Sequence, residues 1–123
     1  MKDCVFCKII SGEFSSYKLY EDDYVLSFLS IDPVSYGHTL VIPKKHILDY
    51  EEIDLEMLNH INKAGKEIYD KINSKLKPDS IKLVQNNGEM QEVKHFHLHI
   101  IPFFNEKKGN KKDFENVLKS IME

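Results

Sequence analysis

The sequence predicts an α+β fold in which a mainly antiparallel sheet packs with one long helix. Residues 54–76 repeat apolar side chains at helical spacing, whereas several shorter segments alternate apolar and polar residues as strands do. The connections between these segments are short. The 123 residues are 41% hydrophobic, which suits one compact domain, so we expect residues 1–123 to form a single domain.

A short helix is predicted near the N-terminus, over residues 5–10, with Gly12 just beyond its end. This helix would place Cys4 and Cys7 one turn apart. They are the only two cysteines of the chain. In a reducing compartment a C-x-x-C pair is more often a metal or redox site than a structural disulfide, so the pair indicates one of those two.

Two strands are predicted in the first half of the chain, over residues 24–29 and 38–43. The segment between them, residues 32–37, has turn residues at both ends and is predicted to be a loop. The second strand alternates, so that one of its faces carries His38, Leu40 and Ile42.

The long helix is predicted to begin after Asp54, a suitable N-cap, and to end before Pro78. After it, residues 81–85 and 93–101 predict two strands joined by the turn-rich segment 86–92. The apolar stripe of the long helix consists of Met57, Ile61, Ala64, Ile68, Ile72 and Leu76. A short C-terminal helix is predicted from the spacing of Phe114, Val117, Leu118 and Ile121.

The composition argues against several partners. The net charge of −3 provides no basic footprint for nucleic acid, and the lysines cluster only in residues 107–112, which predict a solvated loop. No apolar run approaches the roughly 20 residues of a membrane span, and residues 1–10 lack the apolar core of a secretory signal. We therefore expect a cytoplasmic protein that binds neither nucleic acid nor membranes.

The stretch 95-HFHLHIIP-102 carries the strongest chemical signal, because in an extended strand His95, His97 and His99 share one face. The neighbouring histidines would lie roughly 6.6 Å apart and the outer two roughly 13 Å apart, so one ion binds two of them but not readily three. The array therefore predicts that one histidine is available to a metal and the others to a substrate, since imidazole suits both roles. A fourth histidine, His60, lies on the polar side of the long helix and is assigned no role.

This run matches the H-φ-H-φ-H-φ-φ signature, and the chain resembles the histidine triad (HIT) superfamily in its Hint-like, protein kinase C inhibitor-related branch, which contains zinc. Further blocks match in order and spacing: 4-CVFCKIISGE-13, 20-YEDDYVLSFL-29, 37-GHTLVIPKKHI-47 and 86-NNG-88. The resemblance covers nearly the whole chain. It implies a HIT-like fold with an antiparallel five-stranded sheet, one long helix and short terminal helices, in a protein that is typically a homodimer.

The resemblance also implies one structural zinc ion. Its ligands would be Cys4, Cys7, His46 and His95, a set that suits a closed tetrahedral site. Such a site would tie the N-terminal turn to the start of the histidine strand.

The catalytic residues implied by the resemblance are His97, His99 and His38. His97 resembles the nucleophile that attacks the α-phosphorus of a nucleotide ester or amide to form a nucleotidyl-histidine intermediate. His99 would reach a phosphate oxygen or the leaving group. His38, from the neighbouring strand, would support His97.

An AMP-like purine nucleotide is the implied ligand. Side-chain amides of Asn86 and Gln91 would contact its phosphate. Ser30 occupies the position where relatives usually carry a ribose-binding aspartate, and Asp32, two residues further on, is the alternative if the strand continues. The base and sugar would lie against Val5, Phe6, Ile9, Phe28 and Leu40, all of which also fit an ordinary core.

The leading functional prediction is a nucleotide hydrolase or transferase, most specifically a purine nucleoside phosphoramidase-like enzyme. Hydrolysis of dinucleoside polyphosphates is one alternative, and a zinc-containing nucleotide-binding or scaffold module with little turnover is another. The third possibility is motivated by Met90 and Glu92, which replace small residues close to the expected phosphate position. A carboxylate there repels an anionic substrate unless it points away. Another departure is 102-PFF-104, which lacks the arginine that often follows the proline.

Overall fold

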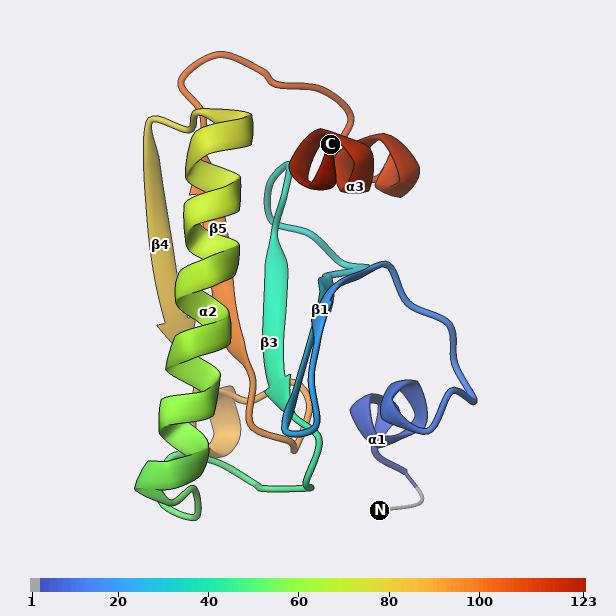
Figure 1. The fold of residues 1–123 in the computed structure, drawn as a ribbon, viewed down its shortest axis with the longest axis vertical. Coiled ribbons are helices and arrows are strands. Elements are labelled where there is room, and N and C mark those ends of the chain that lie inside the picture. Colours follow the sequence, from blue (N-terminus) through green and yellow to red (C-terminus); the bar gives the residue numbers. More distant parts are fainter. Residues whose placement is uncertain (1–2) are drawn as a thin grey trace.

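The computed structural model describes residues 3–123, and in them one antiparallel five-stranded sheet is combined with three α-helices (Figure 1). The strands lie in the order β1-β2-β3-β5-β4. Their bounds are Lys18–Glu21 for β1, Val25–Leu29 for β2, Thr39–Pro43 for β3, Ser80–Gln85 for β4 and Leu98–Phe103 for β5. The helices are α1 (Val5–Ile10), α2 (Leu55–Leu76) and α3 (Phe114–Met122), with a 3₁₀ turn η1 at Gly88–Met90. The predicted fold class is confirmed.

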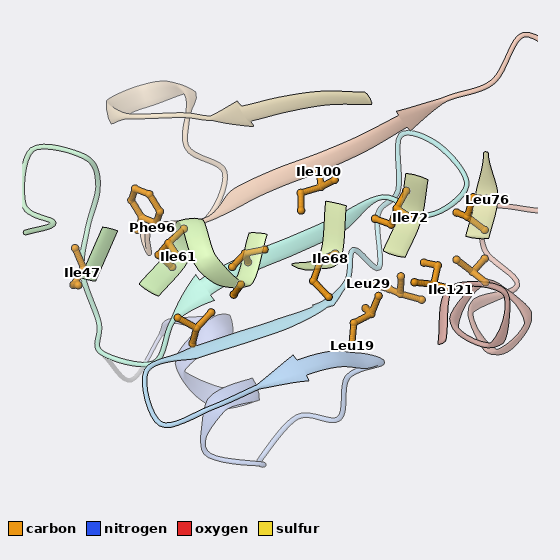
Figure 2. Close-up of a cluster of buried hydrophobic side chains, with 14 residues drawn as sticks. Leu19, Leu29, Ile47, Ile61, Ile68, Ile72, Leu76, Phe96, Ile100 and Ile121 are labelled. Atoms are coloured by element: carbon orange, nitrogen blue, oxygen red, sulfur yellow. The ribbon is translucent and has the colours of Figure 1, made fainter. Parts of the chain in front are cut away.

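The two faces of the sheet are covered by different helices. Because side chains alternate along a strand, Val25 and Leu29 of β2 pack in the cluster that contains α2, whereas Leu26 and Phe28 pack with α1. Figure 2 shows the larger cluster, in which the isoleucines of α2 meet the sheet and α3. Its labelled residues are Leu19, Leu29, Ile47, Ile61, Ile68, Ile72, Leu76, Phe96, Ile100 and Ile121.

The long helix has the predicted bounds. Asp54 is its N-cap, and its carboxylate accepts a hydrogen bond from the Met57 backbone N–H at 2.8 Å. The helix ends at Lys77, which adopts a left-handed conformation with φ 52°, immediately before Pro78. Five of the six predicted stripe residues are buried, and Met57 is partly buried. No helix within residues 3–123 has the length and apolarity that crossing a membrane requires.

Two strand predictions need correction. Residues 18–21 form β1, which the sequence did not indicate, and β5 begins at Leu98 rather than at residue 93. The chain bends before β5: the His95 N–H donates to the Val93 carbonyl, and the Phe96 N–H donates to the Ile47 carbonyl at 2.7 Å. Those bonds replace sheet pairing, so only His99 of the three alternating histidines lies within the strand.

Candidate metal centre and histidine site

Four potential metal ligands come together from three parts of the chain. Cys4 is the N-cap of α1, where its sulfur accepts the Cys7 backbone N–H at 3.3 Å, and the first turn of the helix brings Cys7 beside it. His46 follows β3, and His95 precedes β5. One potential ligand atom from each residue lies within 4.8 Å of those of the other three. The predicted set is therefore assembled in space.

The distances in this cluster suit a tetrahedral ion. Cys7 Sγ lies 3.2 Å from His46 Nδ1 and 3.6 Å from His95 Nδ1, and Cys4 Sγ lies 3.4 Å from His95 Nδ1. Metal–sulfur bonds of about 2.3 Å and metal–nitrogen bonds of about 2.0 Å imply S···N separations of roughly 3.5 Å between ligands of a tetrahedral zinc. The residues present therefore fit zinc in number, chemistry and spacing.

The ring of His95 is oriented by the backbone. Its Nε2–H donates to the Pro43 carbonyl at 2.8 Å, so in the neutral ring the lone pair is on Nδ1, the atom that faces both thiols. Such a carbonyl partner fixes the tautomer that a metal requires. Burial lowers the pKa of His95 to about 4, which keeps the ring neutral at physiological pH. Burial and the adjacent Cys4 raise the pKa of the Cys7 thiol to about 11.

A second cluster consists of His38, His97 and His99. The His97 and His99 ring centroids are 4.7 Å apart, and the Nδ1 atom of His97 donates to the His95 carbonyl at 2.8 Å. The lone pair of neutral His97 is therefore on Nε2. Burial lowers the pKa of His97, and the nearby carboxylate of Glu92 partly offsets this effect. His97 is thus a neutral imidazole whose unprotonated nitrogen is Nε2.

The positions of the protons on His38 and His99 follow from a series of hydrogen bonds. The Val34 backbone N–H donates to His38 Nδ1 at 3.0 Å, so the proton of neutral His38 is on Nε2. That Nε2 lies 2.9 Å from His99 Nδ1, which must then accept and leave its own proton on Nε2. Burial, together with neighbouring histidines, lowers the pKa of both rings to about 4. His99 therefore carries an Nε2–H donor, and its ring centroid lies 4.7 Å from that of His97.

The hydrogen bond of His38 is to His99 and not to His97, the residue that it is expected to support. The register explains the difference: Thr39 of β3 pairs with Ile100 of β5, which places the residue before Thr39 nearer to the β5 strand than to the bend that holds His97. Within residues 3–123 no hydrogen bond joins His38 to His97, but the two rings interact electrostatically, since His97 helps to lower the pKa of His38.

The residues expected to contact the base and sugar lie in one cluster between α1 and the sheet. Phe6, Ile9, Phe28 and Leu40 are buried there, and Val5 packs against them. Phe6 links this cluster to the histidines, since its ring meets those of Phe28, His97 and His95 edge-on at centroid distances of 5.6, 5.1 and 5.8 Å. These side chains form the core beneath the site.

The polar residues expected around a nucleotide are already partly engaged. Ser30 is buried, and its hydroxyl oxygen accepts the Asp32 backbone N–H at 3.3 Å; since β2 ends at Leu29, Asp32 does not continue the strand. Gln91 is buried and its amide nitrogen donates to the Leu48 carbonyl. Asn86 is half-buried after β4.

The sequence could not have revealed the backbone groups that orient the rings. The carbonyls of Pro43 and His95 and the N–H of Val34 each contact a histidine nitrogen. Every residue type except proline carries both groups, so no sequence pattern distinguishes these positions.

The comparisons with known proteins agree with this geometry. The family model of the HIT domain matches residues 11–106 of this chain. The chain is 41% identical over 108 residues to the adenosine 5'-monophosphoramidase HNT1 of Saccharomyces cerevisiae, covering 86% of this chain and 66% of the relative. It is 43% identical over 102 residues to the adenylylsulfatase HINT3 of Arabidopsis thaliana, covering 81% and 52%.

Solved structures share the whole fold. A HIT-like protein from Bartonella henselae superposes with a TM-score of 0.89 at 35% identity and covers 99% of this chain and 96% of its own. A zinc-bound histidine triad protein from Mycobacterium smegmatis superposes with a TM-score of 0.84 at 31% identity, covering 98% and 94%. The fold and the histidine cluster define a histidine triad protein. The chain belongs to the HIT domain family.

Proposed function

We propose that the chain is a hydrolase that cleaves nucleotide esters or amides at the α-phosphate, with purine nucleoside phosphoramidates as substrates and AMP as a product. The observation that carries this proposal is the placement of protons in the histidine site: His97 has its lone pair on Nε2, and His99 has a proton on Nε2. A nucleophile and a hydrogen-bond donor thus lie side by side. The hydrolase activities named for the yeast and Arabidopsis relatives support the same reaction class.

In the first step, Nε2 of His97 attacks the α-phosphorus. The Nε2–P bond forms, the bond from phosphorus to the amine nitrogen breaks, and the departing amine takes a proton from water. The imidazole of His97 becomes positively charged, and its Nδ1–H remains bonded to the His95 carbonyl, which stabilises that charge. The Nε2–H of His99 donates a hydrogen bond to a phosphoryl oxygen or to the leaving nitrogen and keeps its proton.

In the second step, water attacks the nucleotidyl-histidine. The new O–P bond forms as the Nε2–P bond breaks, the proton of the water passes to solvent, and neutral His97 is restored with release of AMP. The balance is one phosphoramidate and one water consumed for one AMP and one amine. The chain His38–His99 keeps its protons in place through both steps, because its low pKa values prevent either ring from being protonated near pH 7.

The experiment that tests this proposal combines turnover of adenosine 5'-phosphoramidate with a titration of AMP binding. Turnover together with mass-spectrometric detection of an adenylyl group on His97 during a single turnover supports the enzyme. AMP binding without turnover indicates a binding module, and neither binding nor turnover indicates a scaffold.

A binding module with little turnover is the second candidate function, and Glu92 is the observation that favours it. Glu92 is exposed, and its negative charge lies close enough to His97 to raise the pKa of that ring. A carboxylate at this position opposes the approach of an anionic α-phosphate. Glu92→Gln separates the two candidates, because an enzyme slowed by repulsion gains activity and a protein without catalytic chemistry does not.

We further propose that one zinc ion is held by Cys4, Cys7, His46 and His95. When bound, zinc would join the start of α1 to the segment before β5, and its role would be structural because all four ligands come from the protein. The convergence of the four ligand atoms within 4.8 Å supports this assignment.

We also propose a homodimer. Its support in this chain is an exposed apolar side chain on an edge strand: Leu83 of β4 is 55% exposed, and β4 lies at the border of the sheet. Edge strands of this kind pair readily with another copy. Light scattering of the parent and of Leu83→Glu measures the oligomeric state, and a parent that is monomeric at micromolar concentration contradicts the proposal.

A further inference from the structure

A cavity of about 570 Å³ lies where β5 leaves the sheet, between the loop that precedes β3 and the segment that leads to α3. It differs from the histidine site in its residues, and neither the metal cluster nor the triad contributes to it. Its lining consists of Ser35, Tyr36, Phe103, Phe104, Lys107, Lys108, Gly109, Asn110 and Lys111.

The lysine-rich segment is a solvent-exposed loop, as the sequence predicts, and it passes beside the rings of Tyr36 and Phe104. The Tyr36 hydroxyl shares a 2.9 Å hydrogen bond with Ser120 Oγ of α3, and its ring meets Phe104 at 82°. A Cβ on Gly109 would lie 3.1 Å from the Tyr36 ring. Glycine therefore allows the backbone of this segment to pass closely over the ring, which gives the cavity a defined wall.

The charge on the cavity is of one sign. Three lysines line it and no carboxylate does, and the ion pairs formed within residues 3–123 use Lys18, Lys44 and Lys66 instead. The ammonium of Lys108 lies 6.0 Å from the centroid of Phe104, so this charge is located over an aromatic face. Lysines that line one cavity without a carboxylate attract a multiply charged anion.

The same cavity offers neutral contacts suited to an aromatic ligand. Phe103 is 63% exposed, which leaves its ring available for stacking. The hydroxyl of Ser35 is buried and has no hydrogen-bond partner among the described residues, although buried hydroxyls are normally paired. The carbonyl of Ser35 accepts the His38 N–H at 3.2 Å, so the cavity wall continues directly into the histidine site.

We propose that this cavity is a second binding site, separate from the histidines, for an aromatic ligand that carries at least two phosphate groups, in chemical class a nucleoside diphosphate or triphosphate. Lys107, Lys108 and Lys111 contact the phosphates. The ring of the ligand stacks on Phe103. This site binds without any turnover at His97, so its existence does not depend on the proposed catalytic function.

The test is titration of the full chain with ADP, followed by amide NMR shifts. Added ADP shifts the amide signals of Gly109 and Asn110. These shifts follow a binding curve that is separate from the curve of the His97 and His99 signals. The triple variant Lys107→Gln/Lys108→Gln/Lys111→Gln weakens the 109–110 response about tenfold, as expected for the loss of three partly exposed charge contacts, and leaves the histidine response unchanged.

A matched control removes three exposed lysines elsewhere: Lys63→Gln/Lys71→Gln/Lys119→Gln has the same net charge and keeps the parental response. Phe103→Ser tests the contact with the aromatic ring separately from the contacts with the phosphates. It weakens the binding of ADP and leaves the binding of inorganic pyrophosphate unaffected. The proposal is overturned if ADP leaves Gly109 and Asn110 unshifted, if both triple variants behave alike, or if pyrophosphate binds this site as tightly as ADP does.

Discussion

His95 and His97 are separated by one residue, yet they belong to clusters with different chemistry. Each ring is held by a backbone carbonyl, but through opposite nitrogens: His95 uses Nε2 to reach Pro43, and His97 uses Nδ1 to reach the carbonyl of His95. The first arrangement turns a lone pair toward two thiols. The second leaves the lone pair of His97 on Nε2, and the His97 ring lies beside that of His99. The chemistry of each histidine therefore depends on which of its nitrogens the fold occupies.

The partners of each cluster reinforce this difference. Around His95 the side chains are those of Cys4, Cys7 and His46, which can all bind one ion. Around His97 the ring neighbours are His99 and Phe6, and it is His99 that is hydrogen-bonded to His38, whose Nδ1 accepts the Val34 N–H. The four potential metal ligands thus face one another, whereas the cluster of His38, His97 and His99 keeps one N–H donor on His99 and one lone pair on His97.

The largest expected effect belongs to the nucleophile. His97→Ala abolishes phosphoramidate turnover and leaves AMP affinity within roughly tenfold of the parent, because a nucleophile is required for chemistry rather than for binding. Steady-state kinetics and calorimetric titration measure the two quantities. If the variant keeps a tenth or more of parental activity, the division of roles between His95 and His97 is wrong.

His99→Ala should be milder. Loss of a positioned donor slows catalysis by about 10²–10⁴-fold while the nucleophile persists. His38→Ala acts mainly through the hydrogen bond of His38 to His99, so the double variant of His38 and His99 should be little slower than His99→Ala. If the rate losses of the two single variants multiply in the double variant, His38 acts directly on the reacting groups.

The histidine site also predicts a pH dependence of stability. Burial lowers the pKa of His38 and of His99 from the ordinary histidine value of 6.5 to about 4 in the folded protein. Between pH 6.5 and 4 the unfolded chain therefore binds more protons than the folded one, and the free energy of unfolding falls as the pH falls through this window. Urea unfolding at pH 7 and pH 5 measures the loss. His38→Gln should reduce it, and an unchanged slope contradicts the buried, neutral state.

Metal removal tests the other cluster. Zinc at a hundred times its dissociation constant stabilises the fold by about 2.7 kcal/mol, so a chelator should lower the melting temperature of the parent. Cys4→Ser should melt early with or without the chelator. Metal analysis of unsupplemented protein gives the stoichiometry, and a zinc-free parent, or a Cys4→Ser variant as stable as the zinc-loaded parent, excludes the structural zinc.

The smallest expected effect is on the affinity for the ribose of AMP. Ser30 offers one short acceptor that already takes the Asp32 N–H, and Asp32 lies beyond the end of β2. Ser30→Asp should therefore tighten AMP by roughly 1–2 kcal/mol, the range for hydrogen bonds to a charged group, and Asp32→Ala should change little. Weaker AMP binding by Ser30→Asp, with a comparable loss for Asp32→Ala, would assign the ribose to Asp32.

Features that depend on neighbouring residues could be predicted from the sequence. The stripe of α2, its cap at Asp54 and its end before Pro78 follow from side chains within a few positions of one another, as does the placement of Cys4 and Cys7 one turn apart. The motif pattern likewise identified the four potential metal ligands, which the structure brings together. Local periodicity and capping act over single turns, so the sequence alone determines them.

Only the tertiary structure decided which nitrogen of each histidine is occupied, where β5 begins, and that His38 contacts His99. These features depend on the Pro43 carbonyl, the Val34 N–H and the Ile47 carbonyl, which meet residues 4 to 52 positions away in the chain. The lysine segment 107–112 is a further case, since its contact with Tyr36 arises only when two distant loops meet. Backbone groups are the same at nearly every position, so which of them a side chain meets depends on how the whole chain packs.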